Sequence, residues 1–208
     1  MKEPAKMIDI STAAGLYNSR FDQYGRNIKT VGWGSESSQH LRFEVLFRGL
    51  DPKGKTILDV GCGLGDLIPY LERHTDGDFK YIGIDIAEKL IDNATSIYGG
   101  EGRVFYVGDI FSIKIPNVDI SVLSGALSFK TIGIEEYARE TMRVMFDLSR
   151  EAASLNFLTK YVDIELEKNQ HYQPETVYSW AKQISKRVNL IDDYPLYEFT
   201  TQILKPVT

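Results

Sequence analysis

The stretch ILDVGCGLGDL, residues 57–67, decides the fold that this sequence predicts. It starts with a short apolar run, interrupted by one aspartate, that is typical of a buried strand. Gly61, Gly63 and Gly65 follow directly, and a segment with helical periodicity comes after them. A strand, a glycine loop and a helix in this order indicate a ligand site. Glycine lets the backbone approach a ligand closely, and the start of a helix offers free N–H groups.

The spacing of these glycines distinguishes between kinds of ligand. The loop reads G-x-G-x-G, whereas dinucleotide-binding loops read G-x-G-x-x-G. The third glycine of a dinucleotide loop would fall at Asp66. A carboxylate at that position would repel a pyrophosphate at the helix start. No G-K-S or G-K-T follows either, so the spacing favours a ligand without phosphates.

Strands and helices alternate through most of the chain. The run at 56–60 is followed by similar apolar or β-branched runs at 79–86, 103–110, 118–127 and 152–159. Helical periodicity follows the first, second and fourth of these runs. Because such alternation forms right-handed crossovers, we expect a mainly parallel sheet with helices on both faces.

The last part of the chain follows a different pattern. Two strand-like runs, residues 187–194 and 197–204, are separated only by a short turn at Pro195. This connection is too short to contain a helix, so the two strands should pair as an antiparallel hairpin. The sequence therefore predicts an α/β, Rossmann-like fold. Its seven-stranded, mostly parallel sheet should end in a C-terminal antiparallel hairpin.

The first fifty residues have helical character and precede the first strand. Their periodicity is broken by glycines on both sides of Trp33, which implies a turn there. We expect residues 1–50 to form a helical lid segment. Residues 51–208 should then form the ligand-binding domain, with the whole chain as one compact unit.

Two aspartates follow the strands next to the glycine loop. Asp85 ends the second strand, about 20 residues after the loop, where a carboxylate can accept both hydroxyls of a ribose. Asp109 ends the third strand and can accept a hydrogen bond from an adenine amino group. Ile86 and Ile110 come directly after these acids and could sandwich the base.

In motif and in order, these residues resemble the class I S-adenosylmethionine-dependent methyltransferases. The first motif of that family resembles [ILV]-[LV]-[DE]-[VIL]-G-x-G-x-G, which residues 57–65 match. Asp85 corresponds to the acid of the second strand, and Gly108 and Asp109 to the glycine and acid of the third. The resemblance covers roughly residues 53–206. It implies S-adenosylmethionine as the cofactor and S-adenosylhomocysteine as the product.

The resemblance also assigns roles around the methionine part of the cofactor. It implies that Asp59 helps to anchor this part and that the backbone of Ser124 and Gly125 lines it. From the lid segment, we expect Arg42 to meet the cofactor carboxylate and Trp33 to cover the methionine side. The predicted cofactor site consists of Trp33, Arg42, Asp59, Gly61, Cys62, Gly63, Asp85, Ile86, Asp109, Ile110, Ser124 and Gly125.

The acceptor side is less defined by the sequence. His40 is the candidate general base, because a neutral imidazole can accept a proton near pH 7. The alternative is an ordinary surface histidine. Aromatic and polar side chains that could line an acceptor pocket are Tyr17, Tyr24, Phe129, Lys130, Asn156 and Tyr161, of which Tyr24, Phe129 and Asn156 are our main candidates. The alternative for the aromatic residues is core packing. No metal site is expected.

Methyl transfer is a displacement at an activated carbon, so the protein mainly has to align the reactants. The SGALSF segment at 124–129 lacks the [DNS]-P-P-[YFW] motif of amino-methylating DNA enzymes. Cys62 lies in the glycine loop and not in the Pro-Cys pair of a cytosine-C5 enzyme. We therefore expect an oxygen or nitrogen of a small molecule as the acceptor. The alternatives are a protein or RNA acceptor, and a subunit that binds the cofactor without catalysis.

Composition limits the partners and the location. The net charge of −5, from 24 basic and 29 acidic residues, disfavours a nucleic-acid partner, which would require clustered positive charge. Apolar runs are too short to span a bilayer, and the MKEPAKMIDI start lacks the apolar run of a secretory signal. Cys62 is the sole cysteine, so a reducing cytoplasm is the expected location. The oligomeric state is not predicted.

Overall fold

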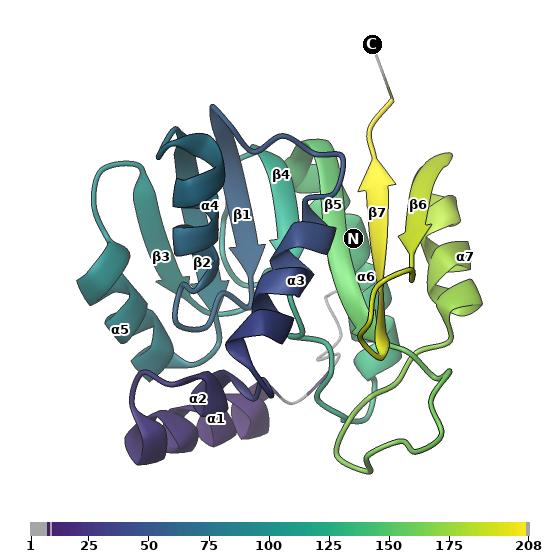
Figure 1. Cartoon of the computed structure of the whole chain (residues 1–208), viewed down its shortest axis with the longest axis horizontal. Helices are drawn as coiled ribbons and strands as arrows, with labels where there is room; N and C mark the ends of the chain where they lie inside the picture. Colours follow the sequence, from purple (N-terminus) through teal and green to yellow (C-terminus); the bar gives the residue numbers. More distant parts are fainter. Residues whose placement is uncertain (1–7, 9, 207–208) are drawn as a thin grey trace.

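The computed structural model describes residue 8 and residues 10–206, and Figure 1 shows strands alternating with helices as expected. One sheet contains seven strands in the order β3-β2-β1-β4-β5-β7-β6. The strands are β1 (Lys55–Val60), β2 (Phe79–Asp85), β3 (Arg103–Val107), β4 (Val118–Leu123), β5 (Ser149–Leu158), β6 (Arg187–Ile191) and β7 (Glu198–Leu204). The predicted Rossmann-like sheet is confirmed.

The first five strands pair in parallel, and the last two pair antiparallel. β7 lies between β5 and β6 and is antiparallel to both, so the predicted C-terminal hairpin is confirmed. Because β1 to β5 all run in one direction, their carboxyl ends meet at the same edge, at the bottom of Figure 1. Residues that follow these strands are thereby brought together.

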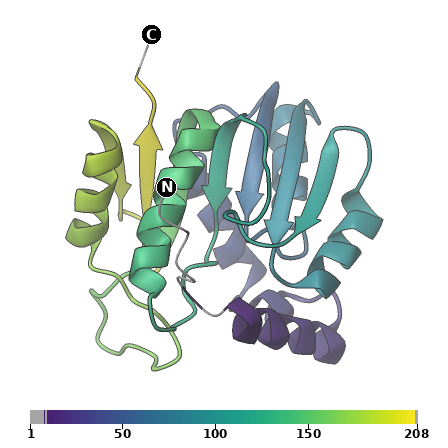
Figure 2. The same cartoon turned by 180° about the vertical axis from the view of Figure 1, so that it is seen from behind.

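Helices cover both faces of the sheet, as Figures 1 and 2 show from opposite sides. One face carries α3 (Glu36–Leu46), α4 (Leu67–Thr75) and α5 (Glu88–Tyr98), and the other carries α6 (Ile134–Leu148) and α7 (Pro174–Ile184). The connection from β3 to β4, residues 108–117, contains no helix. The crossover between these two strands is therefore a loop.

Successive residues of each central strand contribute to two separate cores. In β1, Ile57 packs with Phe43 and Leu71 on the α3 and α4 face. The next residue, Leu58, packs with Met142 on the α6 face. All of these side chains are buried, and each Ile or Leu contributes about 1.5–3 kcal/mol of burial free energy. The strand positions are therefore fixed from both sides.

The N-terminal helices lie below the carboxyl edge of the sheet in Figure 1. They are α1 (Ile10–Tyr24) and α2 (Ile28–Val31), and Tyr17, Phe21 and Val31 of this segment pack against Leu64 and Leu90. The chain turns between α2 and α3, around Trp33, as the glycines predicted. Within residue 8 and residues 10–206, no helix is long and apolar enough to cross a membrane.

Candidate active site

A cavity of about 340 Å³ lies at the carboxyl edge of the sheet, beside α1 and α2. Its volume falls within the range of about 300–1,000 Å³ that is usual for small-molecule sites. The ends of β1, β2 and β4, the loops after them and part of α6 complete its walls. Of the predicted cofactor residues, those that line the cavity are Trp33, Asp59, Gly61, Cys62, Gly63, Asp85, Ile86, Asp109, Ile110, Ser124 and Gly125.

The glycine loop is shaped by contacts that only glycine permits. Gly61 and Gly63 have φ angles of +74° and +55°, which other residues rarely adopt. A Cβ atom on Gly61 would lie 2.4 Å from the Cβ of Ala126, and one on Gly63 would lie 3.0 Å from Val31 Cγ1. The Gly61 N–H donates to the Ile84 carbonyl at 2.8 Å, which ties the loop to β2.

Asp85 joins this loop to the cavity. Its Oδ2 accepts a hydrogen bond from the Gly63 N–H and its Oδ1 accepts one from the Ala87 N–H, both at 2.9 Å. Each carboxylate oxygen can accept a further hydrogen bond from a ligand. Burial raises the pKa of Asp85, while these backbone donors act in the opposite direction. The carboxylate is held in place and still has free acceptor capacity.

Asp109 occupies the equivalent position after β3. Its Oδ1 accepts hydrogen bonds from the N–H groups of Phe111 and Ser112, at 3.0 and 2.8 Å. In the part of the chain that the structure describes, Oδ2 has no hydrogen-bond partner. Tyr137, which the sequence reasoning missed, lines the cavity nearby. Burial raises the pKa of this tyrosine, and the Asp109 charge adds to the effect.

Asp59 is a buried acid on the cavity wall. Its Oδ2 accepts a hydrogen bond from the Tyr81 hydroxyl at 2.7 Å. Burial raises the pKa of Asp59 to about 7, the Tyr81 hydrogen bond opposes this shift, and the charges of Asp85 and Asp66 reinforce it. A cationic ligand beside Asp59 would favour the ionised carboxylate.

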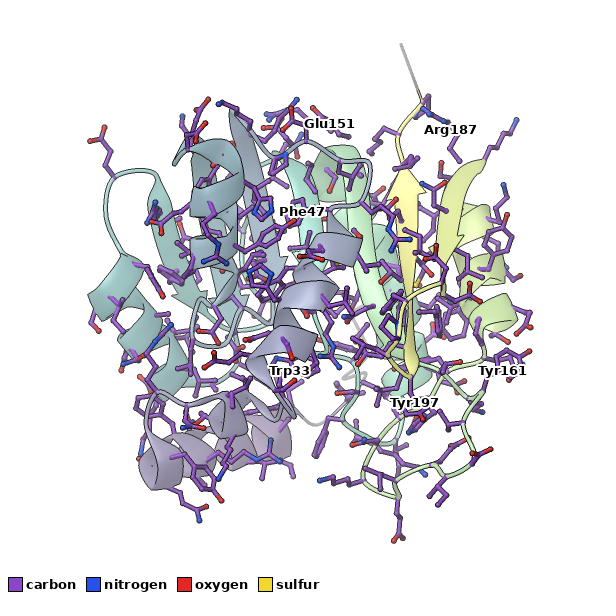
Figure 3. The ribbon with its side chains drawn as sticks, in the orientation of Figure 1. Trp33, Phe47, Glu151, Tyr161, Arg187 and Tyr197 are labelled. Carbon is purple, nitrogen blue, oxygen red and sulfur yellow. The ribbon has the colours of Figure 1, made fainter. Side chains whose placement is uncertain are left out.

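Trp33 and Gly125 form the wall that the sequence placed at the methionine end. The Gly125 φ angle is +74°, and a Cβ atom there would lie only 2.1 Å from Trp33 Cη2. The indole therefore rests directly on the glycine backbone. Figure 3 labels Trp33 at the lower end of α3, above the N-terminal helices. Ser124, next in the chain to Gly125, lines the same cavity.

Arg42 differs from the other predicted cofactor residues, because it does not line the cavity. Its guanidinium is buried and forms an ion pair with Glu198. The guanidinium carbon also lies 4.1 Å from the centre of the Trp33 ring. The sequence predicted that Arg42 contacts the cofactor carboxylate. In the structure, the carboxylate partner of this guanidinium is Glu198 of β7. Nη1 of Arg42 remains buried without a hydrogen-bond partner among the described residues.

The predicted role of His40 is contradicted by its position. On α3, Gln39 and Phe43 are one helical turn apart and line the cavity. His40 lies on a different face of the helix, edge-on to the Tyr70 ring at 5.4 Å and 3.6 Å from a Glu44 oxygen. It does not line the cavity, so it is not placed to act as a base for an acceptor there.

The predicted acceptor residues divide into two groups. Tyr17 and Phe129 line the cavity, whereas Tyr24, Lys130, Asn156 and Tyr161 do not. Tyr24 and Tyr161 are exposed, and Figure 3 shows Tyr161 at the margin of the molecule. Asn156 is buried, and its Oδ1 accepts a hydrogen bond from the Gly125 N–H at 2.7 Å. Its position supports the loop after β4 rather than contact with an acceptor.

Several cavity residues were missed by the sequence reasoning. One face of α1 contributes Ile10, Ala13, Leu16 and Arg20 beside the predicted Tyr17, α6 contributes Ile134, Tyr137 and Thr141, and the loop after β5 contributes Leu166, Lys168 and Asn169. Helical spacing could have revealed the α1 face. The last loop gave no such signal, because a long-range bridge places it against the loop after β4.

Unpaired polar groups test whether an S-adenosylmethionine molecule suits this cavity. Among the described residues, Ser124 and Thr141 line the cavity, and their hydroxyls are buried without hydrogen-bond partners. Buried polar groups are normally hydrogen-bonded, so these groups indicate a polar ligand. With the free acceptor capacity of Asp85 and Asp109, they fit a nucleoside joined to a charged amino acid.

Comparisons with known sequences agree with this geometry. Residues 57–147 match the family model of a methyltransferase domain. The chain is 30% identical over 160 residues to the Mycobacterium tuberculosis protein Rv1506c, which is named as a methyltransferase. That alignment covers 72% of this chain and 93% of the relative.

Solved structures share the fold at low sequence identity. Magnesium protoporphyrin IX methyltransferase from Synechocystis PCC 6803, with bound S-adenosylmethionine, matches with a TM-score of 0.66 and 16% identity over 99% of this chain and 100% of its own. A complex of DhpI with S-adenosylhomocysteine matches with a TM-score of 0.67 and 14% identity over 95% of this chain and 96% of its own. A methyltransferase in complex with the Haloferax volcanii Trm112 activator matches with a TM-score of 0.65 and 13% identity over 92% of this chain and 98% of its own.

The sheet order, the glycine loop and the acids at the ends of β2 and β3 define a class of α/β enzymes that bind an adenosyl cofactor at the carboxyl edge. Together with the sequence relatives, they show the family. The chain belongs to the class I S-adenosylmethionine-dependent methyltransferases, and its cofactor is S-adenosylmethionine.

Proposed function

We propose that this enzyme transfers the methyl group of S-adenosylmethionine to an oxygen or nitrogen atom of a small-molecule acceptor. The observation that carries the proposal is that apolar side chains line the cavity in addition to the predicted cofactor residues. Ile10 and Leu16 of α1, Phe129 and Ile134 near the start of α6, and Leu166 are among them, and we refer to this part of the lining as the proposed acceptor end. A partly enclosed, apolar space suits a small organic molecule.

At the cofactor end, we assign each group by its free hydrogen-bonding capacity. Asp85 would accept the ribose hydroxyls, and Asp109 would accept the adenine amino group between Ile86 and Ile110. Asp59 would offer its carboxylate to the positive charge of the methionine part. The two strand-end acids support this assignment because each is already held by backbone N–H groups on the cavity wall.

We assign Trp33 to cover the methionine part of the cofactor, because this residue lines the cavity and its indole rests on Gly125. Arg42 supports the indole from outside the cavity, with its guanidinium carbon 4.1 Å from the ring centre and its charge paired with Glu198.

When bound, the cofactor supplies a methyl group on a positively charged sulfur. The acids among the described residues that line the cavity are Asp59, Asp66, Asp85 and Asp109, none of which belongs to the proposed acceptor end, and no described histidine lines it. The acceptor atom should therefore already carry a free lone pair, as a carboxylate, an acidic phenolate or an unprotonated nitrogen does. Its lone pair forms the bond to the methyl carbon while the carbon–sulfur bond breaks, and no proton needs to move. The lid and Trp33 exclude water and align the two reactants.

Two cations favour an acceptor with negative charge. Arg20 and Lys168 line the cavity, and neither has a carboxylate partner in the described part of the chain. Arg20 packs over the Tyr17 ring at 5.4 Å, and Lys168 lies on the exposed loop next to Leu166. We therefore propose an apolar acceptor that carries an acidic group.

The alternatives are a macromolecular acceptor and a non-catalytic subunit. The methyltransferase in the Trm112 complex is similar to this chain in fold alone. Its protein partner therefore does not assign a partner to this chain. The division into a lid (1–50) and a catalytic domain (51–208) and the cytoplasmic location also remain predictions.

Fractionation of a cell extract tests the proposal. The enzyme is mixed with S-adenosylmethionine and either the ultrafiltrate or the retained macromolecules, and S-adenosylhomocysteine is measured by mass spectrometry. We expect product only with the ultrafiltrate. Product only with the macromolecules would support a protein or RNA acceptor, and cofactor binding without product in either would support a non-catalytic subunit.

A further inference from the structure

A closed ring of contacts joins separate segments of the chain beside the methionine end of the cavity. It starts at Glu198, the first residue of β7, which is buried. Arg42 Nε donates to both carboxylate oxygens of Glu198, at 2.9 and 2.8 Å, and Nη2 donates to one of them. Arg42 belongs to α3 and lies 156 residues earlier in the chain.

From Arg42 the ring continues to Trp33 and to the loop after β4. The guanidinium carbon lies 4.1 Å from the centre of the Trp33 ring, within the range of a cation–π contact. The Trp33 ring in turn rests on Gly125, where no space remains for a side chain. The buried cation therefore supports the indole from one side, and the glycine backbone contacts the ring at its far end.

Asn156 closes the ring. Its Oδ1 accepts a hydrogen bond from the Gly125 N–H at 2.7 Å, and its Nδ2 donates to Glu198 Oε2 at 3.4 Å. The antiparallel register of β5 and β7 pairs Asn156 with Thr200 and Leu158 with Glu198. Asn156 and Glu198 are therefore diagonal neighbours whose side chains can meet.

We infer that Glu198 is a positioning residue for the cofactor site, because it fixes both walls of the methionine end at once. Through Arg42 it holds Trp33, and through Asn156 it holds Gly125. Without its charge the guanidinium would be buried and unpaired, a state costly enough to move Arg42 out of place. Trp33 would then lose its support. The inference rests on the proposed cofactor role of this wall.

Gln202 provides a matched comparison on the same strand. It is also buried, and its Nε2 donates to the carbonyls of Leu46 and Arg48, at 3.2 and 2.9 Å. Gln202 thus connects the end of α3 to β7. Glu198 connects the middle of α3 to the same strand through Arg42. It does not contact the cavity walls, so its loss should affect stability alone.

The experiment compares Glu198→Gln with Gln202→Ala. S-adenosylhomocysteine affinity is measured by calorimetry below the unfolding midpoint of both variants. Trp33 fluorescence is recorded in a Trp180→Phe background, because the chain has two tryptophans. We expect both variants to unfold at lower temperature. Only Glu198→Gln should weaken binding, by about tenfold or more, and change the Trp33 emission.

Wild-type affinity in a folded Glu198→Gln variant, or an equal loss of affinity in Gln202→Ala, would overturn the inference. If Glu198→Gln does not fold, Asn156→Ala tests the uncharged contacts of the ring, which join Glu198 to Gly125 through Asn156. A several-fold loss of affinity in that variant is expected, and an unchanged affinity would overturn the inference. A wild-type chain that fails to bind S-adenosylhomocysteine would instead contradict the cofactor site itself.

Discussion

The two ends of the cavity are built differently. At the cofactor end, Asp59, Asp85 and Asp109 sit on or directly after strands, and each is held by a hydroxyl or backbone N–H donor. At the proposed acceptor end, the lining comes from one face of α1, the start of α6 and two loops, with exposed apolar side chains such as Leu166. Ile132, on one of these loops, is 94% exposed.

This difference explains why the sequence specifies the cofactor better than the acceptor. Strand ends are positioned by the hydrogen bonds of the sheet and by two cores. The acceptor loops are joined by a few bonds, such as the Gln170 N–H to the Ser128 carbonyl and the Tyr172 hydroxyl to the Leu127 carbonyl. Substitutions should therefore have large effects at the cofactor end and smaller ones at the acceptor end.

Gly61→Ala should have the largest effect. The new methyl group would meet the Ala126 Cβ at 2.4 Å, and φ is +74°. We expect S-adenosylhomocysteine affinity to fall by more than about 100-fold, because strain of roughly 1–3 kcal/mol adds to the clash. Gly77→Ala is the matched control, since its φ is +81° and its Cβ would meet open space. Equal loss of affinity in both variants would contradict this account of the loop.

Asp85→Ala and Asp109→Ala should each have the next largest effect. Loss of a buried polar partner costs about 1–3 kcal/mol, which corresponds to a roughly 5- to 150-fold weaker affinity for S-adenosylhomocysteine. Calorimetry measures the change, with the exposed Asp92→Ala on α5 as the control. Near wild-type affinity in both variants would mean that the acids only cap the loops that follow them.

The raised pKa of Asp59 predicts that the free energy of unfolding changes with pH in a definite direction. Its pKa in the folded chain is about 7, against an ordinary value of 3.8, so folding takes up a proton between these values. The contribution of Asp59 to the free energy of unfolding therefore decreases as the pH rises from about 4 to about 7. Asp59→Asn should remove this contribution, which unfolding measured across that pH range would show.

The same group should make S-adenosylmethionine binding depend on pH. A cationic ligand favours the ionised carboxylate, so wild-type affinity should increase several-fold as the pH rises through about 7. Because an asparagine side chain cannot ionise, the increase should disappear in Asp59→Asn. An affinity that falls with pH, or an unchanged increase in the variant, would exclude Asp59 as a partner of the positive charge.

Lys168→Ala should have the smallest effect. With S-adenosylhomocysteine present, binding of the apolar anion 8-anilinonaphthalene-1-sulfonate is followed by fluorescence. Because Lys168 is exposed, we expect a loss of about two- to fivefold. Lys160→Ala on the same loop is the control, since Lys160 does not line the cavity. Identical affinities in both variants would contradict an anionic subsite at Lys168.

Most of the fold and of the cofactor end could be predicted from the sequence. Strand positions follow from short apolar runs, and Asp85 and Asp109 follow from where those runs end. The predictions were wrong where the rotation of a helix, or the pairing of segments far apart in the chain, determines which side chains reach the cavity. His40 was predicted as the base because a neutral imidazole can accept a proton, whereas the rotation of α3 turns Gln39 toward the cavity instead.

Glu198 was missed for a different physical reason. Its partner Arg42 lies 156 residues away, and no local pattern marks a single acid at the start of a strand. The pairing depends on β7 entering the sheet between β5 and β6, which brings Glu198 beneath α3. The acceptor loop with Lys168 was missed for the same reason, because a long-range bridge positions it.

A crystal structure of the chain with S-adenosylhomocysteine tests the central claim most directly. We predict density in the cavity at the carboxyl edge, with the ribose hydroxyls within hydrogen-bond distance of Asp85, the adenine beside Asp109 and the amino-acid end under Trp33. Density for the nucleoside anywhere else, or ribose hydroxyls that do not contact Asp85, would contradict the account.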